Sequence, residues 1–269
     1  MSMGGTRLPG WGRAATIAVA GLAALAGVGA VIHAQTHSTS VSGATTTTAD
    51  RSSSARRSNI GTGSSTTHRR VRISIDLNAH STTDASSVWV VVNKTHPIKP
   101  LDFTPAVTIV RGYRVTRSAA RPLGLLLNAG DAAGLGFKIE SGYRSYGYQV
   151  SIHDELAASE GGAAADRVSA RGGYSEHQTG LAADLISLTD SRCNMQACFA
   201  ATSAGRWLAS NAWRYGFIVR YRAGDERITG YSPEPWHIRY VGRPLAAAMR
   251  IAGVATLEQV FHISGGNYR

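Results

Sequence analysis

Helical and strand-like patterns of apolar residues occur in the C-terminal two thirds of this 269-residue chain. Residues 118–133 place Leu123, Leu126 and Leu127 on one side of a predicted helix, which Gly134 should end. Other segments with helical character are 146–159, 204–215 and 244–251. These helices predict a folded domain that starts well after the N-terminus.

Short runs of aromatic, β-branched and other apolar residues between the helices predict strands at 136–140, 181–186, 217–221 and 236–241. Side chains alternate along a strand, so His237 should project from the face opposite to Trp236. Residues 161–173 are rich in Gly and Ala and are predicted to form a loop. Segregated helices and antiparallel strands together indicate the α+β class.

The N-terminal part of the chain lacks the composition of a folded domain. Residues 14–32 form an apolar stretch without charge, preceded by two arginines, which predicts a signal peptide or an uncleaved membrane anchor within residues 1–34. The preceding arginines favour an N-terminus inside the cell, so an extracytoplasmic location is expected for the rest. Residues 35–71 are dominated by Ser, Thr and Gly and predict a flexible tether. The folded domain is then expected at 72–269.

The net charge of +11 lies unevenly along the chain, because the residues before Arg72 include seven basic and one acidic. A basic segment next to a membrane would be attracted to anionic lipids or acidic wall polymers. The basic residues are scattered and form no nucleic-acid motif, which argues against a nucleic-acid partner.

Two cysteines, Cys193 and Cys198, lie five positions apart. Outside the cytoplasm such a pair favours a disulfide that closes a small loop. The alternative, that they share a metal site with His177, would require a spacing such as C-x-x-C, which is absent.

Two short stretches, SEHQTGLAAD and EPWH, contain residues suited to metal-dependent hydrolysis. Such sites use three ligands from His, Asp and Glu, a position left for water, and a base. His177, Asp184 and His237 can be the ligands and Glu234 the base. Asp184 lies in an apolar run, where a buried carboxylate needs a partner such as a cation. Pro235 argues against a helix through the second stretch.

Three motifs, SGYRS at 141–145, SEHQTG at 175–180 and EPWHIRY at 234–240, follow one another in an order that resembles the VanY-type D-alanyl-D-alanine carboxypeptidases. These are zinc peptidases of bacterial cell-wall metabolism, and the resemblance spans about residues 86 to 262. It implies a Hedgehog/DD-peptidase-like fold, in which a small antiparallel sheet carries the zinc on its inner face and helices surround it.

The resemblance also implies roles for individual residues, with Zn²⁺ as the cofactor. His177, Asp184 and His237 match the zinc ligands and Glu234 the catalytic base. Arg144 matches an arginine that holds the substrate near the metal, and it is expected to be catalytic as well as substrate-binding, either by stabilising the oxyanion or by binding the terminal carboxylate. The other residues expected to bind substrate are Ser175, Gln149 and, at the pocket wall unless it serves packing, Tyr174.

Two positions depart from the family pattern. Gly172 stands where a proline is usual, which should loosen the loop before the SEHQTG motif. Pro233 replaces a usual aromatic residue beside Glu234, which alters one wall of the expected pocket.

The resemblance implies hydrolysis of the terminal D-Ala-D-Ala bond of peptidoglycan stem peptides, with release of D-alanine. The same site could serve a D,D-dipeptidase or an endopeptidase acting between L-alanine and D-glutamate. A non-catalytic wall-binding module is the alternative from another class. The expected partners are the stem peptide and, if the N-terminal segment is uncleaved, the membrane; the sequence predicts no oligomeric state.

Overall fold

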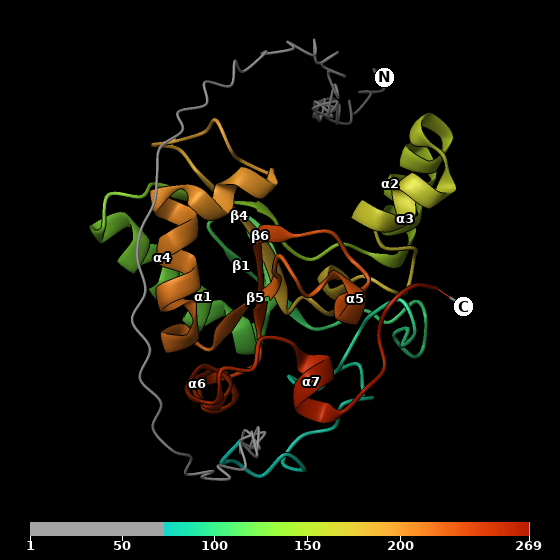
Figure 1. Cartoon of the computed structure of the whole chain (residues 1–269), viewed down its shortest axis with the longest axis horizontal. Coiled ribbons are helices and arrows are strands. Elements are labelled where there is room, and N and C mark those ends of the chain that lie inside the picture. Colours follow the sequence, from blue (N-terminus) through green and yellow to red (C-terminus); the bar gives the residue numbers. More distant parts are fainter. Residues whose placement is uncertain (1–72, 269) are drawn as a thin grey trace, which may run out of the picture. The chain divides into compact units, whose positions relative to one another are not determined.

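The computed structural model describes residues 73–268 (Figure 1). The predicted signal or anchor at 1–34 and the predicted tether at 35–71 lie outside the described residues. Within 73–268, every helix is too short or too polar to cross a bilayer.

A four-stranded antiparallel sheet with the strand order β3-β4-β6-β5 forms the centre of the domain. Its strands are β3 (Phe137–Ser141), β4 (Ala182–Ser187), β5 (Phe217–Tyr221) and β6 (Glu234–Tyr240). The predicted α+β class and the small antiparallel sheet are therefore confirmed. The last strand begins two residues earlier than predicted, so Glu234 is part of β6.

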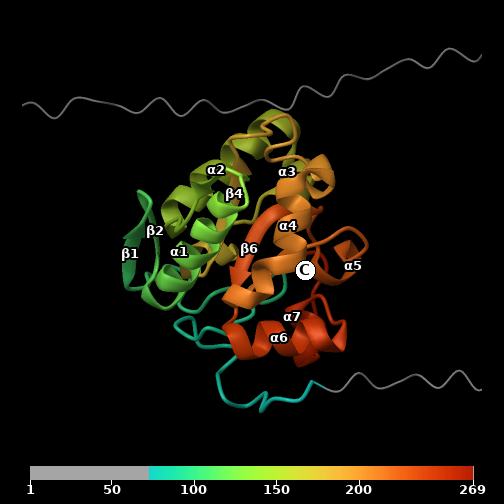
Figure 2. The same ribbon diagram turned by 90° about the vertical axis from the view of Figure 1, so that its left-hand side faces the viewer.

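Helices α1 (Arg117–Ala132) and α4 (Ser203–Asn211) cover one face of this sheet (Figure 2). The core between them contains side chains from the helices and from the strands, including Leu123, Leu126, Leu127, Leu208, Phe217 and Ile238. Each fully buried leucine of this kind contributes about 1.5–3 kcal/mol of hydrophobic stabilisation. Trp236 and Tyr240 pack against the same core, so Trp236 lies on the core-facing side of β6. His237 projects from the opposite side, as predicted.

The two ends of the domain carry separate helix pairs. Helices α2 (Tyr146–Glu160) and α3 (Gly162–Val168) lie at the end opposite to α6 (Arg243–Ala252) and α7 (Leu257–Phe261) (Figures 1 and 2). The pair α6–α7 packs against a second core cluster that includes Trp89.

The loop predicted at 161–173 is wrong over half its length, because residues 162–168 form α3. Three consecutive alanines favour a helix here, and Ala165 is fully buried. Gly161, with φ 86°, separates α2 from α3. The helix predicted at 204–215 is divided into α4 and a 3₁₀ helix, η3 (Ala212–Tyr215).

A two-stranded sheet of β1 (Val107–Val110) and β2 (Tyr113–Thr116) was not predicted. Its turn residues Arg111 and Gly112 both have positive φ, the pattern of a type I′ hairpin, but the sequence lacks the usual Asn-Gly signal. The remaining short elements are η1 (Glu176–Thr179), η2 (Ala197–Ala201) and α5 (Glu226–Thr229).

The predicted disulfide between Cys193 and Cys198 is confirmed, with an S–S distance of 2.14 Å. It closes a loop between β4 and α4.

Candidate active site

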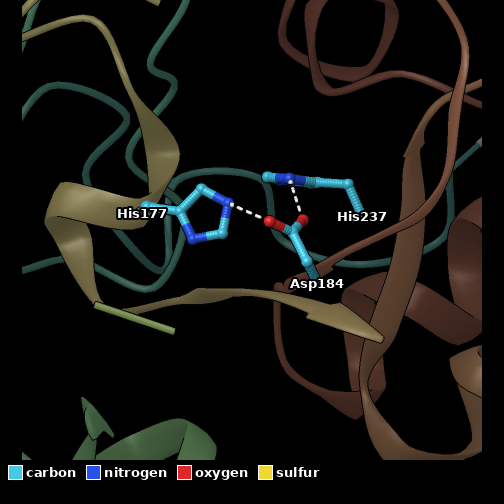
Figure 3. Close-up of side chains that lie close together, drawn as sticks. All are labelled: His177, Asp184 and His237. Atoms are coloured by element: carbon cyan, nitrogen blue, oxygen red, sulfur yellow. Dashed lines mark ion pairs between the residues drawn. The ribbon is translucent and has the colours of Figure 1, made fainter. Parts of the chain in front are cut away.

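Two adjacent strands and a short helix bring the three predicted ligands together. Asp184 on β4 and His237 on β6 are directly paired across the antiparallel ladder, so their side chains leave the same face of the sheet. His177 lies on η1, and Gly180, in the left-handed conformation with φ 68°, ends that helix just before β4 begins. Figure 3 shows that each oxygen of the Asp184 carboxylate faces a different imidazole.

The ligating atoms of these three side chains all lie within 4.8 Å of one another, and all three residues are buried. Asp184 Oδ2 is 3.2 Å from His177 Nε2, and its Oδ1 is 3.1 Å from His237 Nδ1. Despite these short distances, His177 Nε2 and Asp184 Oδ1 have no hydrogen-bond partner among the described residues. Buried polar atoms without partners are costly, and a cation between them would satisfy both. Two imidazoles and one carboxylate fit Zn²⁺ with a fourth position left for water.

Each imidazole is oriented through its other ring nitrogen. His177 Nδ1 donates a hydrogen bond to the carbonyl oxygen of Gly142 at 2.7 Å. His237 Nε2 lies 3.3 Å from Oε2 of Glu176. These partners leave Nε2 of His177 and Nδ1 of His237 facing Asp184, the arrangement in which second contacts fix the tautomer of a ligating histidine.

The charges around the site are those that a cation-binding cluster requires. Burial and the nearby Arg144 lower the pKa of His177 to about 4, so its imidazole is neutral. Burial opposes ionisation of Asp184, but the two histidines hold its pKa well below the usual range. Burial likewise opposes protonation of His237, yet the carboxylates of Asp184 and Glu176 raise its pKa to about 9. Binding of a cation would therefore displace a proton from His237.

Glu234 is the carboxylate that was predicted to be the base. Its Oε2 lies 3.6 Å from His237 Nδ1, beside the ligand cluster. Burial, reinforced by the charge of Asp184, raises the pKa of Glu234 to about 7, although His237 opposes the shift. A pKa near neutrality suits a general base that must accept a proton and then give it back.

A small cavity of about 50 Å³ brings the predicted base and most of the predicted substrate-binding residues next to His177 and His237, two of the three predicted ligands. Its lining includes Arg144, Gln149, Ser175, His177, Glu234 and His237. Arg144 Nε and Gln149 Oε1 are buried without hydrogen-bond partners among residues 73–268. The Gln149 side chain is held by its Nε2, which donates to Ala170 O at 2.7 Å. Unpaired polar groups in the lining can therefore contact a polar ligand.

Tyr174 does not line this cavity. Its ring packs edge-on against Tyr268 with the centroids 5.1 Å apart. Its role in substrate binding stays a prediction.

The loop before the SEHQTG motif packs closely against α2, although it lacks the usual proline. A Cβ atom at Gly172 would lie 2.5 Å from Cγ2 of Val150. Gly173 O accepts a hydrogen bond from Ile98 N at 2.7 Å. Packing and this hydrogen bond restrict the loop in place of the proline ring that is usual at position 172.

Pro233 lines a second, larger cavity of about 510 Å³, which shares only Tyr221 with the smaller one. This larger cavity lies among residues of α4, β5 and α6 and contains none of the predicted ligands. The small cavity is therefore the candidate active site, because it contains the chemically competent groups.

Sequence reasoning missed the residues behind the ligands. Glu176 contacts His237, Arg220 and Arg239, all of them buried. One signal in the sequence could have pointed to Glu176: each of the apolar strands β5 and β6 contains an arginine, and a buried cation needs a buried anion as its partner.

Comparison with known proteins identifies a family with sequences similar to this chain. The sequence profile of the VanY family, described as D-alanyl-D-alanine carboxypeptidase, matches residues 112–243. The protein named as carboxypeptidase YodJ of Bacillus subtilis (strain 168) is 37% identical over 164 residues, which are 61% of this chain and 59% of YodJ. The chain thus spans less than two thirds of that curated relative.

Solved structures agree with this match. The LdcB LD-carboxypeptidase, whose structure was described in terms of peptidoglycan recognition, has a TM-score of 0.61 and 32% identity, covering 68% of this chain and 89% of its own. A variant of the vancomycin-resistance D,D-pentapeptidase VanY, in complex with Zn(II), has a TM-score of 0.56 and 32% identity, covering 66% of this chain and 99% of its own. The fold and the cluster of two histidines, an aspartate and a nearby glutamate are those expected of a metallopeptidase. This chain belongs to the VanY family of that class.

Proposed function

We propose that this protein is a zinc-dependent D-alanyl-D-alanine carboxypeptidase, which releases the terminal D-alanine of peptidoglycan stem peptides. The observation that carries the proposal is the cluster of His177, Asp184 and His237, whose two histidines line one small cavity together with Glu234 and Arg144. A non-catalytic wall-binding module would have no use for a partly buried carboxylate beside the ligand cluster whose pKa lies near neutrality.

His177, Asp184 and His237 would hold Zn²⁺, which supplies Lewis-acid polarisation of the scissile carbonyl and lowers the pKa of water. Glu234 accepts a proton from the attacking water. It then delivers that proton to the amine of the departing D-alanine, so one carboxylate serves as base and acid.

Arg144 is the cation available for the substrate in the cavity. Its guanidinium can form a bidentate ion pair with the C-terminal carboxylate of the peptide or stabilise the developing oxyanion. Gln149 and Ser175 offer neutral polar groups on the same wall. The small volume of the cavity, about 50 Å³, suits a residue with a side chain as short as that of alanine.

An L,D-carboxypeptidase acting on tetrapeptide stems is the second candidate. It is favoured by the similarity to LdcB, whose TM-score of 0.61 is higher than that of the Zn(II)-bound VanY structure. The two activities differ in the configuration of the residue before the scissile bond, so they use the same metal and base.

An extracytoplasmic location follows from the same proposal, because the stem peptides of the wall lie outside the membrane. The uncharged apolar stretch at residues 14–32, with arginines before it, supports export or anchoring.

Product analysis with defined stem peptides tests the proposal. Purified protein is incubated with a pentapeptide ending in D-Ala-D-Ala, a tetrapeptide ending in one D-alanine, and free D-Ala-D-Ala, each with and without chelator. The proposal expects D-alanine and tetrapeptide from the pentapeptide alone, and only when metal is present. Cleavage of the tetrapeptide alone would establish the L,D-activity, and cleavage of the free dipeptide alone would establish a dipeptidase. No cleavage by metal-loaded protein would refute an enzymatic role on these substrates.

A further inference from the structure

Behind His237 lies a group of four charged side chains that the proposed mechanism does not use. Glu176, Arg220, Arg239 and Glu258 are each at most 2% exposed. They come from η1, β5, β6 and α7, so the group joins segments that are distant in sequence. We call these four residues the buried ion quartet.

The quartet is balanced in charge and closely bonded. Arg220 Nε and Arg239 Nη1 both donate to Oε1 of Glu176 at 2.8 Å. Arg220 also donates from Nη1 and Nη2 to the two carboxylate oxygens of Glu258, at 2.9 and 2.7 Å. Two buried cations are thus matched by two buried anions, which is the condition for keeping such charges away from water.

The two oxygens of Glu176 have different partners. Oε1 accepts from both arginines, while Oε2 lies 3.3 Å from Nε2 of His237. This Nε2 is the ring nitrogen that does not face Asp184. The carboxylate of Glu176 therefore reaches the metal-site histidine on one side and a fixed pair of guanidinium groups on the other.

Contacts outside the quartet hold Arg239 and Glu258 in place. Arg239 Nη2 donates to the carbonyl oxygens of Val88 and Val90, at 3.2 and 2.8 Å. On the other side, Asn93 Nδ2 donates to Oε1 of Glu258 at 3.0 Å. Arg239 is thus anchored by backbone carbonyls independently of Glu258, and it holds Oε1 of Glu176.

We infer that Glu176 is a positioning residue: it holds the imidazole of His237 in the tautomer and ring orientation that present Nδ1 to the metal. The inference rests on the proposed metal site. A carboxylate that accepts from the second nitrogen of a ligating histidine fixes the ring and raises its basicity, and loss of such a contact typically costs about 10–100-fold in metal affinity. Glu258 serves a different purpose, because it balances Arg220 and touches no ligand.

This division of roles gives a matched pair of variants, Glu176→Gln and Glu258→Gln. Each removes one negative charge from the same quartet, and only the first changes a contact of His237. Zinc dissociation constants are measured on the full 269-residue chain by competition with a chromophoric chelator, and urea unfolding of the metal-free proteins reports stability. Because each variant leaves a buried cation uncompensated, both should unfold at lower urea concentration than the parent.

The inference expects Glu176→Gln to weaken zinc binding by about 10–100-fold and Glu258→Gln to leave the zinc dissociation constant at the parent value. Equal zinc affinity in the parent and Glu176→Gln would overturn the inference. An equal loss of zinc affinity in both variants would also overturn it, because the loss would then come from the disturbed charge balance alone. If Glu176→Gln does not fold, Glu176→Asp replaces it: the charge stays for the arginines, while the shorter side chain withdraws from His237. Weaker zinc binding in Glu176→Asp supports the inference, and unchanged binding overturns it.

Zinc affinity is measured without substrate, so the outcome is independent of the proposed peptidase activity. A parent protein that binds zinc but releases no D-alanine would refute the proposed function and leave the positioning role to be judged by the affinities.

Discussion

Replacing Glu234 with glutamine removes the proposed base and keeps the shape of the side chain. Two acidic residues line the small cavity, and of these Glu176 is already bonded to both buried arginines. The nearby Asp184 lies between the two histidines. Neither carboxylate is therefore free to take over proton transfer from Glu234. General-base catalysis contributes about 10²–10⁴-fold to a rate, which corresponds to about 2.7–5.4 kcal/mol of transition-state stabilisation at 1.36 kcal/mol per decade.

We expect Glu234→Gln to lower kcat by that factor while zinc stays bound at one ion per chain. The assay is D-alanine release from the pentapeptide, followed by oxidation of the free D-amino acid, together with metal analysis of the same sample. Glu234→Ala should lose activity as well and retain the metal. A kcat within about tenfold of the parent, with zinc present, would show that the proton acceptor is another group, because even the lower limit for a base exceeds that factor. Loss of zinc along with activity would instead make Glu234 a ligand.

Three further outcomes are expected. Dialysis against a chelator should abolish D-alanine release, and one equivalent of Zn²⁺ should restore it; activity that survives complete removal of metal, verified by elemental analysis, would contradict the metal site. Leu208→Ala, at a fully buried position of α4, should lower the free energy of unfolding by about 2–5 kcal/mol. Its kcat per folded molecule should stay unchanged, because Leu208 lies on the face of the sheet away from the ligands. A loss of kcat in the folded protein would contradict this separation. Thr202→Ala removes the hydroxyl that accepts a hydrogen bond from Gly205 N at 3.0 Å at the start of α4. Urea unfolding should show that the free energy of unfolding falls by about 1 kcal/mol. An unchanged urea midpoint would mean that this helix cap contributes nothing to stability.

The strands that carry the site were predictable, because their apolar and alternating sequence patterns match the burial of their side chains in the sheet. The apolar run around Asp184 forms β4. The alternation at 236–241 correctly separated His237 from the apolar face that includes Trp236. The prediction of the ligand set needed the family resemblance as well, because each histidine alone is a weak signal for a metal.

Other features depend on contacts that sequence alone does not specify. The helix α3 forms in a Gly/Ala-rich segment because Ala165 is buried and Asp166 pairs with His153 and Arg171. The pairing of Glu176 with Arg220 joins residues 44 positions apart, so neither local spacing nor propensity indicates it. Tyr174 next to the SEHQTG motif packs on Tyr268 near the end of the chain, which no local pattern could reveal.

The direct pairing of Asp184 with His237 in the β4–β6 ladder has a consequence for how this enzyme family can vary. A single residue inserted before Trp236 within β6 would turn Trp236 toward the ligand cluster and His237 into the apolar core, because each one-residue slip reverses the faces of a strand. Natural length variation in relatives should therefore spare β4 and β6 and accumulate in the connections at 188–202 and 222–233, where an added residue leaves the ladder in register.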